Sequence, residues 1–138
     1  MNATDFTNEP SALLNDYTRS NGQDKALGMS PEETVMLLVQ AAIDKGHLAI
    51  ACHKSRSLTE KGFHLGRMTS IIDALRDRLN FGYKIAYDLE TLYAYIDKCL
   101  QKAVFENGTQ ELEAAVQMLS EIHQAWQVSL ERLNAMSA

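Results

Sequence analysis

From Ser30 onward the sequence repeats one pattern, in which large apolar side chains recur at alternating spacings of three and four residues. This spacing places the apolar side chains on one face of an α-helix, whereas a half-buried strand would need strict alternation. Four such segments follow one another, and each predicts an amphipathic helix of about 20–25 residues. The apolar rows are Met36, Val39, Ile43, Gly46 and Ile50; Leu65, Met68, Ile72, Leu75 and Leu79; Ile85, Leu89, Leu92, Ile96, Cys99 and Ala103; and Leu112, Ala115, Leu119, Ile122, Trp126 and Leu133.

Local signals indicate where these helices begin and end. Ser30-Pro31-Glu32-Glu33 forms a capping box with proline at the first helical position, and Ser57-Leu58-Thr59-Glu60 forms a second capping box. Asn80-Phe81-Gly82 interrupts the pattern, and Asn107-Gly108 is a stop signal at the end of the third helix. Short connections make consecutive helices antiparallel neighbours. The sequence therefore predicts an all-α fold, an antiparallel up-down-up-down four-helix bundle, as a single domain over residues 30–136.

Residues 1–29 differ from the bundle because they are polar and rich in turn-forming asparagine and glycine. They contain one short helical pattern, in which Leu13, Leu14 and Tyr17 follow a Ser11 cap and Gly22 ends the pattern. A helix of this length is marginal in water unless its apolar side chains dock on a larger surface. We therefore expect a flexible N-terminal arm with a short helix.

Length and charge restrict the class of protein. The chain has 138 residues, which suits one domain, and its 13 basic and 18 acidic residues give a net charge of -5. Its basic residues are not clustered, which argues against nucleic acid as a partner. The first basic residue is Arg19, and Asp5 and Glu9 stand where a secretory signal would be positive. The longest run of large apolar residues, Val35–Val39, is too short to span a membrane. We expect a cytoplasmic protein that does not insert into membranes.

The sequence offers little for catalysis or metal binding, although small helical bundles often hold metals or cofactors. No Glu-x-x-His motif is present, and Glu60 and His64 make a single pair four residues apart. Cys99 lies on an apolar row and Cys52 beside one, so both are interpreted as small, reduced, buried side chains. The chain has no glycine-rich phosphate loop. We expect no enzyme, cofactor or metal, and a small cofactor or metal bundle remains the alternative. The histidines are His47, His53, His64 and His123.

The informative feature is apolar surface that a simple bundle does not need. In the first helix Leu37, Ala41 and Leu48 point away from the apolar row. In the third helix Tyr87 and Phe105 point away from the row and Tyr95 lies on its flank. A cluster of apolar residues outside a bundle indicates a partner surface. The same face would also suit a self-associating structural protein, so a homodimer is a second alternative.

Four stretches, in this order and at these spacings, resemble a known family over Ser30 to about Leu130. They are Met29–Glu33 with Met36-Leu37 and Ala41-Ala42-Ile43; Ile71-Ile72-Asp73 with Leu75 and Leu79; Ile85-Ala86, Leu89 and Leu92-Tyr93-Ala94-Tyr95-Ile96; and Glu106-Asn107, Leu119 and Ala125-Trp126. With these stretches the chain resembles the flagellin-specific export chaperones of bacterial flagella, which are all-α cytoplasmic proteins of about this length.

The resemblance implies a function in flagellar type III secretion. A chaperone of this family wraps the C-terminal segment of flagellin around its helical bundle, keeps it unpolymerised and presents it to the flagellar export gate. The implied mode is an apolar segment that folds as it binds into a groove. On this reading Leu37, Ala41, Leu48, Tyr87, Tyr95 and Phe105 line the flagellin groove, and Leu13, Leu14 and Tyr17 cap it when no client is bound.

Overall fold

The computed structural model describes residues 22–137, so the expected cap residues Leu13, Leu14 and Tyr17 lie outside the described residues. The elements are α3 (Gly22–Ala26), α4 (Pro31–Lys54), α5 (Leu58–Asp77), α6 (Lys84–Phe105) and α7 (Gln110–Ser137). This helical architecture confirms the predicted all-α class.

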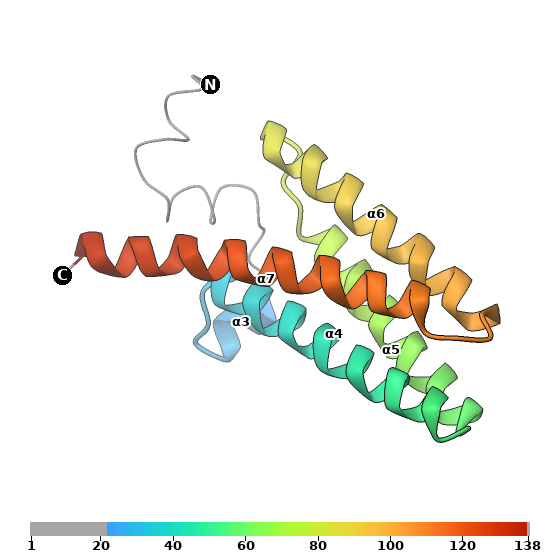
Figure 1. The fold of residues 1–138 in the computed structure, drawn as a ribbon. Helices are drawn as coiled ribbons and strands as arrows, with labels where there is room; N and C mark the ends of the chain where they lie inside the picture. The colour runs from blue at the N-terminus through green and yellow to red at the C-terminus, as the bar shows by residue number, and fades with distance from the viewer. Residues whose placement is uncertain (1–21, 138) are drawn as a thin grey trace.

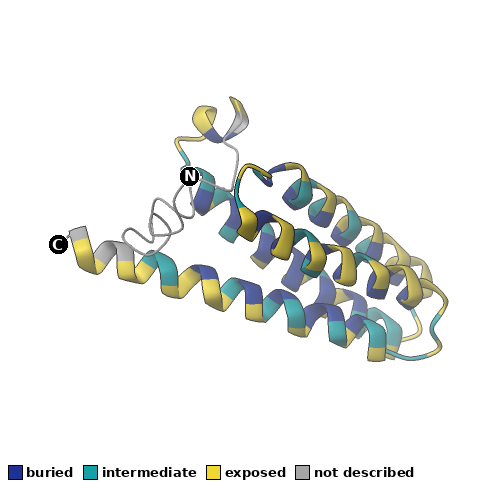
Figure 2. Ribbon diagram, turned by 90° about the horizontal axis from the view of Figure 1, so that it is seen from above, coloured by how far each residue is buried: buried dark blue, intermediate teal, exposed yellow. Residues whose placement is uncertain are grey.

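Each long helix packs against two others (Figure 1). α4 contacts α5 and α7, and α6 contacts the same two helices, so α4 and α6 occupy diagonal corners of the bundle. Consecutive long helices run in opposite directions in Figure 1, and each connection between them is short. The C-terminal part of α7 extends beyond the end of the bundle in both views (Figures 1 and 2).

The core forms where the apolar rows meet, and Figure 2 shows buried positions along each of the four long helices. The second row is buried throughout, and the fourth is buried from Leu112 to Trp126. In the first row Met36 and Ile50 are only partly buried against the core. The third row differs most, because Ile85 is 38% exposed while Tyr93 and Leu100, which the row omits, are each 1% exposed. α6 faces both α5 and α7, so its buried face is wider than a single row.

α4 approaches its neighbours most closely at Gly46. A Cβ atom at this position would overlap Val116 Cγ2 of α7 and would lie 3.1 Å from Met68 Cε of α5. Glycine therefore lets three helices meet without a void or a clash at this level of the core.

The two predicted capping boxes behave differently. At Ser30 the hydroxyl accepts a hydrogen bond from the Glu33 backbone N–H at 3.2 Å, as the sequence predicts. At Ser57 the predicted start of α5 is confirmed, because this residue is its N-cap, but the predicted side-chain capping bond is not formed, and the Ser57 hydroxyl lies 3.2 Å from that of Ser55. The connection is only three residues long and contains Arg56 in the left-handed region, with φ at 63°. This tight turn uses the Ser57 hydroxyl within the loop.

α3 is a helix that the sequence pattern did not predict, because Gly22 was expected to end a helix and not to begin one. Asp24 of α3 forms an ion pair with Arg78 just after α5, and the two residues are 2% and 7% exposed. Gly28, with φ at 70°, ends the turn in the left-handed conformation that favours glycine. A tertiary contact thus fixes a helix that is too short to form alone.

α4 combines a buried face with apolar residues on its outer side. It is the one helix among residues 22–137 that is long and apolar enough to cross a membrane by length and composition alone, a property shared by core helices of soluble proteins. Here α5 and α7 pack against α4, which buries residues such as Val39 and Ile43. Leu37 and Leu48 are exposed on its outer side.

Candidate partner-binding groove

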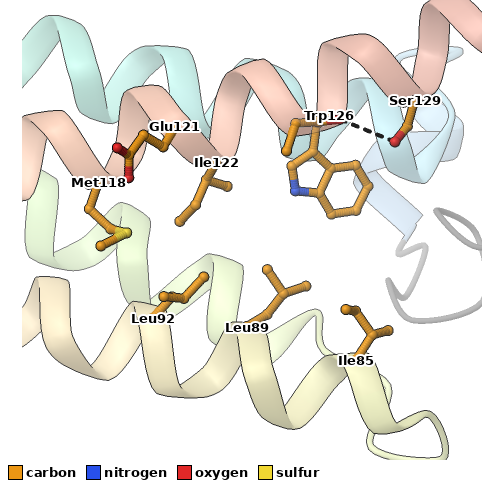
Figure 3. A pocket seen from close by; sticks show the side chains of 9 residues that line it. Ile85, Leu89, Leu92, Met118, Glu121, Ile122, Trp126 and Ser129 are labelled. Atoms are coloured by element: carbon orange, nitrogen blue, oxygen red, sulfur yellow. Dashed lines mark hydrogen bonds between the residues drawn. The ribbon is translucent and has the colours of Figure 1, made fainter.

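A groove opens between α6 and α7 at the end of the bundle where α6 begins (Figure 3). Its volume is about 410 Å³. Its walls are mostly apolar side chains, with two polar residues among them. Its lining consists of Ile85, Leu89 and Leu92 from α6 and Met118, Glu121, Ile122, Ala125, Trp126 and Ser129 from α7.

The groove is made from residues of the core rows and not from residues of the outer faces. Ile85, Leu89 and Leu92 follow the i, i+4, i+7 spacing of an inward-facing stripe. In the structure Ile85 is 38% exposed and Leu92 is only partly buried. Figure 3 shows their side chains directed toward the Ile122 and Trp126 side chains across the groove. The first turns of α6 therefore leave part of the bundle's own core face uncovered.

An ion-pair network holds the same part of α6 to α5. Arg76 of α5 bonds both carboxylate oxygens of Glu90, with Nε 3.0 Å from Oε2, and lies 3.8 Å from Asp97. These side chains are about one third exposed or less, so the pairs are partly shielded from solvent. The network ties α6 to α5 on one side, while a different side of α6 faces the groove.

The groove is suited to apolar side chains because its polar groups are few. Trp126 forms part of its wall and is 4% exposed. The Ser129 hydroxyl donates a hydrogen bond to the Ala125 carbonyl of the same helix, at 3.1 Å. Glu121 is an exposed carboxylate among the lining residues. Such a trough fits the apolar face of an amphipathic helix.

The residues predicted from the outer faces lie elsewhere. On α4, Leu37 and Leu48 are 59% and 45% exposed, and Ala41 is half-buried. They share one line along the outer face of α4, as their spacing predicts. None of them contributes to the α6/α7 groove.

On α6, Tyr87, Tyr95 and Phe105 are 58%, 47% and 90% exposed, and they too lie outside the α6/α7 groove. Tyr87 packs against Phe81 with ring centroids 5.0 Å apart. Because α4 and α6 are diagonal, the structure does not bring the six predicted residues together into one groove. The sequence signal for the groove is not an outward-facing apolar residue. It is Ile85, the first residue of the third apolar row, which lies in the first turn of α6.

Neither thiol is arranged as a nucleophile. Burial raises the pKa of the Cys99 thiol. The hydrogen bond between Tyr95 and Cys99 raises the pKa of the Tyr95 hydroxyl. Desolvation and the Glu60 carboxylate, whose Oε2 is 3.8 Å from Sγ, raise the pKa of Cys52. Both cysteines are free thiols, and at neutral pH they remain protonated.

The Glu60 and His64 pair is not part of a metal-binding cluster. The His64 ring packs edge-on against Phe63, with centroids 5.5 Å apart. Within residues 22–137, no three His, Cys, Asp or Glu side chains gather in a way that could hold a metal ion.

Comparison with known proteins assigns the family. The sequence model described as "Flagellar protein FliS" matches residues 13–132. The chain belongs to the FliS family. This assignment confirms the resemblance to flagellar export chaperones, and it makes the protein a member of a family of chaperones, a non-enzymatic kind of protein.

Two curated FliS relatives match over most of their length. The flagellar secretion chaperone FliS of Vibrio cholerae serotype O1 is 28% identical over 115 residues, which cover 82% of this chain and 85% of that protein. The flagellar secretion chaperone FliSB of Pseudomonas aeruginosa is 25% identical over 115 residues, which cover 82% of this chain and 91% of that protein. The matched region of the FliS family model includes all of the groove residues.

Proposed function

We propose that this protein is a cytoplasmic flagellar secretion chaperone that binds the C-terminal segment of flagellin. Binding would prevent premature polymerisation of flagellin and assist its delivery to the export gate. The observation that carries the proposal is the apolar α6/α7 groove in a member of the FliS family.

The groove supports this function through its size and chemistry. From Ile85 to Leu92 it extends about 10 Å along α6, at about 1.5 Å per residue, which matches two turns of a client helix. A client helix would place side chains at i, i+4 and i+7 against Leu89, Ile122 and Trp126. Burial of these surfaces would supply the affinity and offset the entropy lost when a disordered client segment becomes ordered.

The exposed side chains on α4 and α6 would extend this contact. Leu37 and Leu48 lie on one corner of the bundle and Tyr87 and Phe105 on the diagonal corner. A compact partner could not cover both corners, whereas a long segment that continues around the bundle could. This arrangement favours a client segment that wraps around the chaperone. It is less suited to a partner that docks as a rigid body.

Titration calorimetry with the C-terminal segment of a flagellin from the same genome tests the proposal. Ile85→Asp places a charge in the groove, and Val128→Asp is the matched control because the two residues are 38% and 39% exposed. Val128 does not line the groove. We expect Ile85→Asp to weaken binding at least about tenfold and Val128→Asp to leave it nearly unchanged. Absence of binding by the unaltered protein would refute the proposed function.

Light scattering of the same samples separates the client from self-association. A one-to-one complex with the flagellin segment is expected. A dimer that does not bind the segment would instead favour a self-associating structural protein.

A further inference from the structure

A second pocket lies at the opposite end of α6 from the groove. It has a volume of about 360 Å³ and forms where the end of α4, the first two turns of α5 and the end of α6 meet. Between Ile85 and Phe105 the axis of α6 covers about 30 Å at about 1.5 Å per residue, so the two sites are separate. The second pocket is lined by His53, Leu58, Lys61, Gly62, Leu65, Val104, Phe105, Glu106 and Asn107.

Lys61 gives this pocket a buried positive charge. The residue is only 5% exposed, and its Nζ lies 3.0 Å from His53 Nδ1 and donates to the Glu106 carbonyl at 3.4 Å. A lysine ammonium has three N–H donors, so one donor has no acceptor among residues 22–137. Lysine is rarely buried to this extent without an acidic partner.

No carboxylate of the described residues pairs with Lys61. The Glu106 carboxylate, from the same pocket, instead accepts from the Glu111 backbone N–H at 3.0 and 3.3 Å at the start of α7. The Glu60 carboxylate, which precedes Lys61, lies 3.8 Å from Cys52 Sγ. The acid next to Lys61 in the sequence and the acid that lines the same pocket are therefore both engaged elsewhere.

The surroundings of this charge are apolar and open to a partner. Leu58 of α5 is 61% exposed, and Val104 and Phe105 of α6 are 56% and 90% exposed. These side chains stand on two sides of the pocket, since they come from different helices. A ligand complementary to this site carries a negative charge between apolar groups.

We propose that this pocket binds an acidic side chain, Asp or Glu, of the client segment, with its carboxylate on Lys61 Nζ and its apolar neighbours on Leu58, Val104 and Phe105. The inference rests on the proposed function and adds to it a second, charge-specific contact. A side chain fits better than a chain terminus, because apolar surface on both sides of the lysine can contact residues before and after the acid.

The distance between the two sites predicts the position of that acid in the client. A separation of about 30 Å corresponds to about 20 residues of helix or about nine residues of extended chain between the acid and the helix in the groove. An acid at such a spacing from an apolar helical stripe is the residue to test first.

A double-mutant cycle measured by titration calorimetry tests the inference. Lys61→Met removes the charge and keeps the length of the side chain, and each Asp or Glu of the flagellin C-terminal segment is changed in turn to Asn or Gln. We expect Lys61→Met to weaken binding of the unaltered segment about tenfold, as loss of a charge-assisted hydrogen bond would. One substitution in the segment should cause the same loss, and the two together should cause no further loss.

Three outcomes would overturn the inference. If, for every acidic position, the loss of affinity in the double variant equals the product of the two single losses, no acid in the segment contacts Lys61. Loss on amidation of the segment's C-terminus, with no coupled side chain, means that the terminal carboxylate occupies the pocket. Binding of the segment that depends on Ile85 and not on Lys61 refutes the inference alone, whereas no binding by the unaltered protein refutes the proposed function with it.

A second variant, at the exposed pocket residue Phe105, provides a test that does not depend on whether Lys61→Met disturbs folding. Phe105 is 90% exposed, so Phe105→Ser cannot remove core packing. It should weaken binding about threefold, and it should be coupled to an apolar client residue next to the same acid. An unchanged circular dichroism melting curve for both variants is expected, and normal binding by Phe105→Ser would contradict the proposed seating of the segment.

Discussion

Asp24 and Arg78 form a buried ion pair across 54 positions of sequence, and this pair joins α3 to the end of α5. The Arg78 Nη1 donates to Asp24 Oδ2 at 2.8 Å, and a second bond joins Nη2 to Oδ1. Two parallel bonds between a guanidinium and a carboxylate fix both distance and orientation. The pair therefore anchors the segment that precedes α4 at a defined place on the bundle.

Asp24→Ala should destabilise the protein because it removes one half of a buried pair. Loss of a single partner leaves a buried charge uncompensated and typically costs about 3–5 kcal/mol. Urea denaturation followed by circular dichroism measures the change in the free energy of unfolding. Adding Arg78→Met to this variant should recover part of the loss, and equal losses for the single and double variants would argue against the pair.

Gly46→Ala and Gly66→Ala should have opposite effects although both residues lie in helices. At Gly66 no atom of residues 22–137, apart from its own chain neighbours and helix backbone, lies within 4 Å of the added Cβ, so better helix propensity should stabilise the protein by up to about 1 kcal/mol. At Gly46 the Cβ overlaps the branched Val116 side chain, and overpacking should cost about 1–3 kcal/mol and exceed that gain. Thermal melting of the two variants compares them directly, and stabilisation by Gly46→Ala would show that α4 can shift freely.

Leu48→Asp should leave the thermal midpoint within a few degrees of the unaltered protein and weaken binding of the flagellin segment. Leu48 is 45% exposed on the outer face of α4, so the charge remains in solvent. Calorimetry and thermal melting of the same sample separate the two effects. Unfolding of the variant would place Leu48 in the core.

Raised pKa values at Cys99 and Tyr95 predict that stability decreases in alkali. Burial raises the pKa of Cys99 above its ordinary value of 9.0, so the folded state holds its proton more tightly than the unfolded chain does. This contribution is complete below about pH 9 and is lost as the pH rises through the higher value in the folded protein. The free energy of unfolding, measured from pH 7 to pH 11, should decrease less steeply for Cys99→Ala. An unchanged slope would exclude Cys99 as a source.

Features that depend on local periodicity can be predicted from the sequence. Features that depend on contacts between distant residues cannot. The exposure of Leu37 and Leu48 followed from helical spacing alone, and so did the burial of Leu119. The α3 helix depends on Arg78, a residue more than 50 positions away, which no local pattern could reveal. The groove depends on how far α6 stands from α7, and periodicity assigned Ile85 to the core without knowing that the core stays open there.

The open core at the start of α6 links ligand occupancy to folding. A helix seated against Ile85, Leu89 and Trp126 would act as a fifth member of the bundle and would bury surface that the protein alone leaves in water. Because such a ligand binds only the folded chain, the melting temperature would rise with its concentration. The chaperone would then be most stable when it is loaded, and the empty form would unfold first on heating.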